Sequence, residues 1–213
     1  MKTNLSKQKV IEAASALFFQ KGFHGTSVRD IAEKANVNVS LISYYFKGKQ
    51  GLLEYAVTDY YEKYLDTMEE ALEHYQDLYA LDQLKELIFI IIQYKQSNHQ
   101  FSCFIHRELS LDSVFVREMA VTYLAKENYF ISRAFFSVLD KQHSSINDRN
   151  YLLMQLKGML ITPYIMHNEW KNHIIGDGSH DLFVTNYVKT IHRWLDFLVE
   201  VSGEKIAEDA HGR

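Results

Sequence analysis

The side chains with the clearest chemical role lie between residues 38 and 49. A helix over this stretch, at 100° per residue, would carry hydroxyl and basic groups on one side, namely Ser40, Ser43, Tyr44 and Lys47. Its other side would carry Ile42, Tyr45 and Phe46. Hydroxyl and ammonium groups donate hydrogen bonds to phosphate oxygens. A helix of two turns with little apolar area depends on its neighbours for stability, so we interpret it as a helix that is held in place to contact a nucleic acid.

A second short helix is predicted directly before it. Ser27 and Asp30 have the spacing of a capping box, and Thr26 is a second candidate for the N-cap. One apolar helical face follows at i, i+3, i+4 and i+7, made of Val28, Ile31, Ala32 and Ala35. Asn36 can end this helix in the left-handed conformation, and Asn38 can cap the next. Together the two helices have the arrangement of a helix-turn-helix that enters a major groove.

Other reactive residues give weaker patterns. Cys103 and His106 are three apart and could form a thiol and base pair, but a buried structural cysteine is the more common case and no oxyanion donors can be identified. His167 and His173 are six apart and would lie on different faces of a helix, so they do not predict a metal site. We therefore expect no catalytic residues, no metal and no cofactor, and a protein that is not an enzyme.

Composition and charge point to a helical protein with a basic N-terminal end. The 213 residues are 47% hydrophobic and include one proline and nine glycines, which favours an all-α fold of long helices. Residues 1–50 hold eight lysines and arginines against three acids, a net charge of +5, and the remaining residues hold 15 against 24, a net charge of −9. A basic end on an acidic body directs DNA to that end.

The single cysteine, Cys103, cannot form an internal disulfide and predicts a reducing, cytoplasmic location. Because DNA binding is expected, we expect the protein at the nucleoid. The basic N-terminal residues lack the continuous apolar run of a signal peptide. The most apolar run, Leu87–Ile92, is far shorter than the roughly 20 residues that span a bilayer. We expect no membrane partner.

Periodicity predicts a chain of about nine helices. The first covers residues 6–21 with Ser6 as its cap, and Gly22 and Gly48 end the first and third helices. Later helices are expected at 49–75, 81–98, 101–109, 112–142, 150–171 and 181–201, with Pro163 kinking or dividing the helix at 150–171. The predicted domains are a helix-turn-helix head at 1–48, a dimerisation and regulatory body at 49–202, and a disordered tail at 203–213.

Residues 6–53 also carry a recognisable pattern, composed of Thr26 to Ala32, Ala35, Val37, Tyr45 to Lys47, Lys49 and Leu52. This pattern resembles the N-terminal signature of the TetR family of bacterial transcriptional regulators. The resemblance implies a three-helix head that binds DNA and a helical C-terminal domain that dimerises and often encloses a ligand pocket.

By position, the resemblance assigns phosphate contacts to Thr26 or Ser27, Tyr44 and Lys49. It assigns base edges or nearby phosphates to Val39, Ser40 and Ser43. The full predicted DNA-contact set is Thr26, Ser27, Arg29, Asn38, Val39, Ser40, Ser43, Tyr44, Lys47 and Lys49. Many members of the family carry Gly where Asn36 stands and Tyr where Ser43 stands, so base recognition should differ from theirs.

The body is predicted to form a homodimer through its last two long helices, packed as a four-helix bundle. The expected interface residues are Leu153, Leu160, Trp194 and Leu198. Two recognition helices about one DNA turn apart, roughly 34 Å, would then require a palindromic site.

Two hypotheses remain for what the dimer does on DNA. Residues 35–54 and 106–119 resemble a division-associated family member from sporulating bacteria, which implies the cell-division protein FtsZ as a partner and Arg107, Glu108, Arg117 and Glu118 as a contact surface. The alternative for these four residues is internal salt bridges or a solvated face. The competing hypothesis is a ligand-responsive repressor, with a small-molecule pocket lined by Phe101, Phe104, Tyr123, Phe130, Met154, Met159, Tyr164 and Trp170; the same residues fit a close-packed core equally well.

Overall fold

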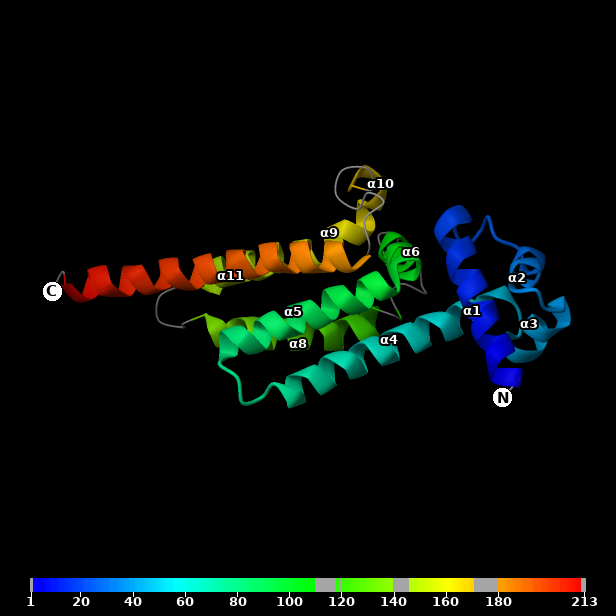
Figure 1. The fold of residues 1–213 in the computed structure, drawn as a ribbon, viewed down its shortest axis with the longest axis horizontal. Coiled ribbons are helices and arrows are strands. Elements are labelled where there is room, and N and C mark those ends of the chain that lie inside the picture. Colours follow the sequence, from blue (N-terminus) through cyan, green and yellow to red (C-terminus); the bar gives the residue numbers. More distant parts are fainter. Residues whose placement is uncertain (1, 110–117, 119, 140–145, 171–179, 212–213) are drawn as a thin grey trace. The chain divides into compact units, whose positions relative to one another are not determined.

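A computed structural model describes the backbone of residues 2–109, 118, 120–139, 146–170 and 180–211, and the side chains of 6–108, 118, 121–139, 148–169 and 181–200. Every secondary-structure element within these ranges is a helix (Figure 1), which confirms the all-α class. None of the helices in the described residues is both long and apolar enough to cross a membrane.

The chain divides into two compact units, which are described separately. Unit 1 comprises residues 1–64 and 98–116, and unit 2 comprises 65–97 and 117–213. Unit 1 therefore contains the predicted head, residues 1–48, and adds the first part of α4 (Lys49–His74) and α6 (His99–Leu109). It is discontinuous in sequence, which the predicted boundary at residue 48 did not anticipate.

In unit 1, α1 (Lys2–Lys21) packs against α2 (Val28–Ala35) and α6, and α2 packs against α3 (Val39–Phe46). The rings of Phe18 on α1 and Phe104 on α6 stack with their centroids 5.2 Å apart, and both are buried. Helix α6 is thus part of the core that supports α1.

Unit 2 is built around α5 (Ala80–Ser97), which packs against α8 (Ala125–Val138), α9 (Ile146–Ile165) and α11 (His180–His211). The apolar face predicted for this helix is buried, and it consists of Leu84, Leu87, Ile88, Ile91 and Ile92. The central position expected for this segment is confirmed.

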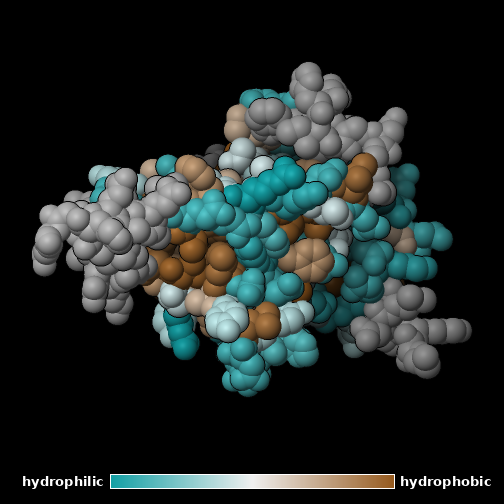
Figure 2. Space-filling model, turned by 60° about the vertical axis from the view of Figure 1, so that its left-hand side comes forward, coloured by the Kyte–Doolittle hydropathy of each residue, from teal (hydrophilic) through white to brown (hydrophobic). Residues whose placement is uncertain are grey.

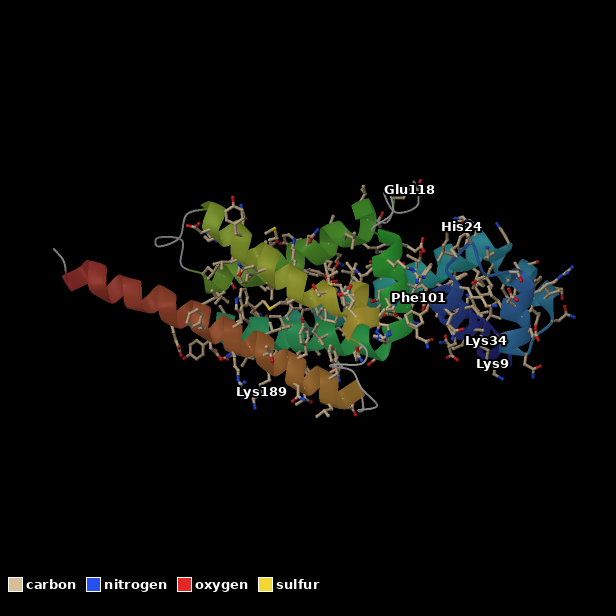
Figure 3. All side chains as sticks on the ribbon, turned by 90° about the horizontal axis from the view of Figure 1, so that it is seen from above. Lys9, His24, Lys34, Phe101, Glu118 and Lys189 are labelled. Carbon is tan, nitrogen blue, oxygen red and sulfur yellow. The ribbon has the colours of Figure 1, made fainter. Side chains whose placement is uncertain are left out.

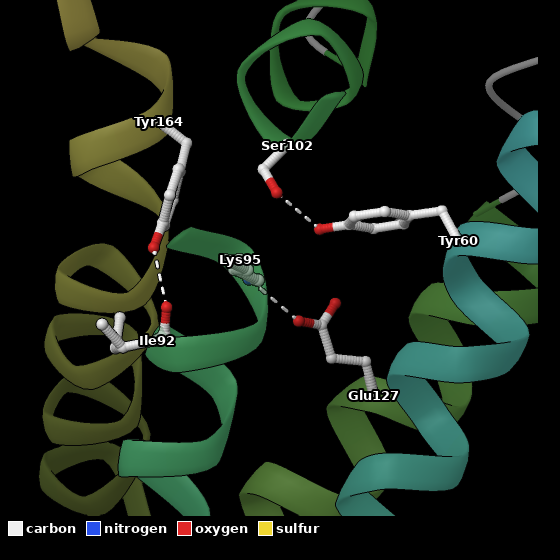
Figure 4. Close-up of polar contacts among 6 residues, drawn as sticks. All are labelled: Tyr60, Ile92, Lys95, Ser102, Glu127 and Tyr164. Carbon is white, nitrogen blue, oxygen red and sulfur yellow. Dashed lines mark hydrogen bonds and ion pairs between the residues drawn. The ribbon is translucent and has the colours of Figure 1, made fainter. Parts of the chain in front are cut away.

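Polar side chains are also buried within each unit (Figure 4). In unit 2, Lys95 of α5 is 1% exposed and forms an ion pair of 3.2 Å with Glu127 of α8, while the Tyr164 hydroxyl of α9 donates to the carbonyl oxygen of Ile92. In unit 1, the hydroxyl oxygens of Tyr60 and Ser102 lie 2.8 Å apart. Each contact satisfies polar groups that would otherwise be costly to bury.

Several helix limits differ from the predicted ones. Helix α1 begins at Lys2, so Ser6 lies inside it and is not its cap. The described part of the predicted helix 112–142 is divided into a π-helical turn, η1 (Ala120–Leu124), and α8. Pro163 lies near the end of α9, and α10 (His167–Trp170) follows as a separate segment. The helix expected at 150–171 is thus divided near the proline, as predicted. The backbone of α11 is helical to His211, where a disordered tail was expected from residue 203.

Candidate nucleic-acid interface

Local hydrogen bonds fix both ends of α2 and the start of α3. Ser27 Oγ accepts from the amide of Asp30 at 3.1 Å, and the Asp30 carboxylate accepts from the amide of Ser27 at 2.9 Å, so the capping box is confirmed. These bonds to Ser27 lower the pKa of Asp30. Asn36 ends α2 in the left-handed conformation at φ 52°, and Asn38 caps α3 by accepting from the amide of Ser40 at 2.9 Å. All three predicted caps are therefore present.

Helix α3 ends at Phe46, two residues before the glycine predicted to end it. Lys47 is its C-cap at φ 58°, and its amide donates to the carbonyl of Ser43 at 3.0 Å; Gly48 follows at φ 113°. The left-handed conformation costs a residue with a side chain roughly 1–2 kcal/mol. The turn leaves the Lys47 side chain exposed beside the last turn of α3.

The outward face of α3 contains the residues predicted for it. Tyr44 is 78% exposed and Val39 is 43% exposed, whereas Ile42 is completely buried. Within the described residues, the side chains of Ser43 and Lys47, and of Arg29 on α2, make no hydrogen bond or ion pair. Ser40 is also exposed, and its hydroxyl donates to Asn38 Oδ1 at 2.8 Å. The face is available to a ligand, and its contact with DNA stays a prediction.

The two hydroxyls at the start of α2 are already bonded within the chain. Thr26 is 2% exposed, and its hydroxyl lies 2.8 Å from the carbonyl oxygen of Gly22 and 3.2 Å from that of Leu17. The Ser27 hydroxyl donates to Asp30 at 2.7 Å. The Thr26 hydroxyl is enclosed, so a phosphate contact through it would require this loop to rearrange, and a phosphate at Ser27 would have to replace the Asp30 carboxylate. Both contacts stay predictions.

Lys49 also has a role that its sequence position did not indicate. Its Nζ donates to the carbonyl oxygens of Phe23 at 2.8 Å and Thr26 at 2.7 Å, and it lies 4.4 Å from the centre of the Phe23 ring. Two of its three N–H groups thus hold the loop between α1 and α2. The lysine predicted to bind phosphate is chiefly a link between this loop and α4.

Two lysines outside the predicted set extend the basic surface of unit 1. Lys9 of α1 and Lys34 of α2, both labelled in Figure 3, line a shallow groove of about 450 Å³ together with Glu12 and Asn36. In the sequence, these lysines contribute to the net charge of residues 1–50 and belong to no further pattern. Their shared groove depends on the packing of α1 against α2, which no local pattern specifies.

Within the described residues, only part of the predicted partner surface is exposed and free of internal contacts. The Arg107 guanidinium donates to the carbonyl oxygens of Phe18 at 2.8 Å and Phe19 at 3.3 Å, so it caps the C-terminal end of α1. Arg107 therefore has an internal role. This is close to the alternative of internal salt bridges, although its partners are backbone carbonyl oxygens. Glu108 is half-buried and Glu118 is exposed. Arg117 lies outside the described residues.

The predicted dimer residues are mostly turned inward. Leu160 is 1% exposed and Leu153 is 9% exposed, so both side chains are enclosed by their own subunit and have little surface to offer a partner. Trp194 is half-buried and stacks on Phe135 with their ring centres 6.4 Å apart, and Leu198 is half-buried. The predicted dimer contact through these four residues stays a prediction, and the burial of the two leucines of α9 speaks against their part in it.

Different residues of the same two helices are exposed and apolar. On α9 these are Tyr151, Met154 and Ile165, and on α11 they are Leu182 and Phe197, each at least 53% exposed. The Tyr187 hydroxyl of α11 donates to the carbonyl oxygen of Met159 on α9 at 2.7 Å, so the two helices are joined within one subunit. Figure 2 colours each residue by its hydropathy, and hydrophobic residues, in brown, are gathered on the face that it shows.

Cys103 does not have the environment of a reactive thiol. Burial raises its pKa to about 12, so the thiol is protonated at neutral pH. The Nε2 atom of His99 lies 3.6 Å from its sulfur. Only the thiolate is an effective nucleophile.

The aromatic and methionine residues proposed for an effector pocket are dispersed. Phe101 and Phe104 are buried in unit 1, with their ring centres 5.8 Å apart, while Tyr164 is buried in unit 2. Met154 is 65% exposed. The Trp170 side chain lies outside the described residues. The burial of the two phenylalanines and Tyr164 supports the alternative that they belong to a close-packed core.

The chain is similar in sequence to known bacterial regulatory proteins. Residues 10–56 match the model described as "Bacterial regulatory proteins, tetR family". The chain is 38% identical over 191 residues to the probable HTH-type transcriptional regulator YttP of Bacillus subtilis, covering 89% of this chain and 92% of that protein. It is 28% identical over 86 residues to the biofilm operon regulator IcaR of Staphylococcus epidermidis, covering 40% and 45% of the two chains.

Solved structures of similar fold include a putative fatty acid metabolism regulator of Clostridium perfringens, with a TM-score of 0.67 and 19% identity over 87% of this chain and 97% of that one. The haemolysin II regulator HlyIIR has a TM-score of 0.63 and 18% identity over 88% and 97%. At these identities, the similarity establishes the fold alone.

Proposed function

This chain belongs to the tetR family of bacterial regulatory proteins, and we propose that it binds palindromic double-stranded DNA as a homodimer. The observation that carries the proposal is the outward face of α3, where Tyr44, Ser43 and Lys47 are exposed while Ile42 anchors the helix from behind. Such a face suits phosphate contacts and a few base contacts. We further propose a cytoplasmic, non-enzymatic protein located at the nucleoid.

The DNA proposal is tested first without an assumed operator. Purified protein is incubated with fragmented chromosomal DNA, and the bound fragments are sequenced. Recovery of sites that share an inverted repeat supports the proposal. Recovery of unrelated fragments in proportion to their abundance contradicts it.

Variants then test the face itself on a recovered site. Arg29→Gln should weaken binding to specific and unrelated DNA alike and reduce the slope of log K against log salt by about 1, because one fewer counterion is released. Tyr44→Phe should weaken binding without changing the slope, because its hydroxyl is uncharged. Lys189→Gln, on the exposed surface of α11, is the control for lost charge. Equal losses in Arg29→Gln and Lys189→Gln would remove Arg29 from the interface.

For the division role, we propose that the dimer resembles RefZ and acts on FtsZ, with the resemblance of residues 35–54 and 106–119 as support. Because Arg107 caps α1, reversing its charge would disturb unit 1 and cannot isolate a partner contact. The exposed Glu118 is the better position. Wild-type protein should sediment with FtsZ polymers, and the Glu118→Lys variant should sediment with them less. If the wild-type protein does not bind FtsZ polymers, the repressor is the remaining function.

The alternative function is a ligand-responsive repressor. It is favoured by one observation in unit 2, a groove of about 490 Å³ between α4 and α8, whose volume lies within the range of small-molecule sites. Release of operator DNA by a metabolite would support this function.

A further inference from the structure

The groove in unit 2 is built from two matching helical faces. Its residues on α4, Glu69, Leu72 and Glu73, recur at i, i+3 and i+4, and those on α8, Phe130, Arg133, Ala134 and Ser137, recur at i, i+3, i+4 and i+7. Gln76, just beyond the end of α4, also lines the groove. Gln83 of α5 completes the lining. The repeated spacing means that each helix turns one continuous face to the groove.

The base of the groove is apolar and its walls are charged. Phe130 is 7% exposed, Ala134 is 5% exposed and Leu72 is half-buried. Glu73 on one wall and Arg133 on the other are exposed. A ligand here would meet an apolar surface below and opposite charges at its two sides.

The charges at one end of the groove are paired across it. Lys126 of α8 contacts Glu69 of α4 at 2.9 Å and lies 5.4 Å from the centre of the Phe130 ring. Side chains of the two helices can therefore bridge the groove at this end, and both members of this pair already have a partner.

Further along, the opposite charges do not meet. Within the described residues, the Glu73 carboxylate has no ion pair or hydrogen bond, and the Arg133 guanidinium has only a 3.4 Å hydrogen bond to the Tyr129 hydroxyl. An arginine can bind a carboxylate through two parallel hydrogen bonds. Each wall thus offers one ionic contact that the chain itself does not use.

The C-terminal end of α4 determines which charge is favoured at each wall of the groove. Glu73 lies in the last turn of α4, where the helix dipole favours a cation. Gln83 Nε2 donates to the carbonyl oxygens of Leu72 and Tyr75 at 3.3 and 3.5 Å, which leaves its Oε1 as an acceptor near the same helix end. A positive group is therefore favoured at the α4 wall and a negative group at the α8 wall.

We propose that this groove binds a small zwitterion with an apolar body, such as a short peptide, with its ammonium at Glu73 and its carboxylate at Arg133. Apolar side chains of the ligand lie against Phe130 and Leu72. As an effector site, the groove rests on the proposed regulatory function, whereas ligand binding itself does not require DNA.

The test is calorimetric titration of the full chain with the dipeptide leucyl-leucine, its N-acetyl form and its C-terminal amide. Only the unmodified dipeptide should bind well, and each blocked form should bind roughly ten- to a hundredfold more weakly, because one charged hydrogen-bonding group is lost. Glu73→Gln should weaken binding of the unmodified dipeptide but not further weaken that of the N-acetyl form. Arg133→Gln should show the corresponding behaviour with the amide.

Glu70→Gln on α4 and Arg193→Gln on α11, both exposed and outside the groove, are the matched controls and should bind as the wild type does. Thermal unfolding checks that each variant is folded. Absence of binding at millimolar dipeptide, or equal binding of the blocked forms, overturns the proposal. Operator binding measured without dipeptide separates this failure from failure of the DNA-binding function.

Discussion

Lys49 connects the loop between α1 and α2 to α4 through the carbonyl oxygens of Phe23 and Thr26. A charged hydrogen-bond donor in this setting contributes to the stability of unit 1 whether or not DNA is present. The same ammonium retains one N–H for a phosphate. Its two roles can be separated by measuring folding and DNA binding independently.

We expect Lys49→Met to lower the free energy of unfolding by about 1.5–3 kcal/mol, because the carbonyl oxygens lose their charged donor. Urea unfolding followed by circular dichroism measures this change. Lys63→Met is the control, since Lys63 is exposed and its i,i+4 pair with Asp59 is worth only about 0.5 kcal/mol or less. Unchanged stability together with lost DNA binding would restore the phosphate role.

Capping residues could be predicted from sequence because a cap depends on neighbours within four positions. Ser27, Asn36 and Asn38 all have the predicted conformations. The hydrogen bonds from Thr26 to Leu17 and from Lys49 to Phe23 and Thr26 could not be predicted, since these acceptors are 9 to 26 residues away and are brought close by the packing of helices.

At the scale of the helix, α5 and α11 are joined by polar contacts beside their apolar faces. His192 Nε2 of α11 donates to the carbonyl oxygen of Lys85 on α5 at 3.0 Å, and the Lys85 ammonium pairs with Asp196. Burial lowers the pKa of His192, an effect that the Lys85 hydrogen bond and nearby carboxylates only partly offset.

The unfolded chain therefore takes up a proton at His192 more readily than the folded one, so this residue should make the protein less stable as the pH falls below 6.5. We expect His192→Gln to show a smaller loss of stability between pH 7 and pH 5 than the wild type. Urea unfolding across this range measures it, with His24→Gln, an exposed histidine of unit 1, as the control. Identical pH dependence in wild type and His192→Gln would contradict the assignment.

Helix positions were predicted better than helix orientations. Apolar periodicity identified α9 and α11, yet both faces of α9 carry large apolar residues: Leu153 and Leu160 are enclosed, while Met154 one position along is exposed. A difference of one residue is 100° on a helix. Sequence pattern cannot decide which of two apolar faces packs within the subunit.

At the scale of the whole molecule, we propose that the exposed apolar residues of α9 and α11 form the contact between two subunits. Met154→Glu and Phe197→Glu should each weaken the dimer by about 2 kcal/mol or more, because a carboxylate would be buried in an apolar contact. Analytical ultracentrifugation measures the monomer–dimer equilibrium. Val121→Glu, 77% exposed on η1, is the control. Wild-type dimerisation in both variants would place the interface elsewhere.

The inclusion of α6 in unit 1 has a consequence for synthesis of the protein. Phe18 and the end of α1 are covered by Phe104 and Arg107, which leave the ribosome on the order of several seconds after α3. A nascent chain that has emerged only as far as α3 therefore exposes part of the surface of α1 that it will later bury. For the same reason, exchanging DNA specificity between relatives by grafting residues 1–48 alone would pair one protein's α1 with another's α6, so a working chimera should carry both segments from the same parent.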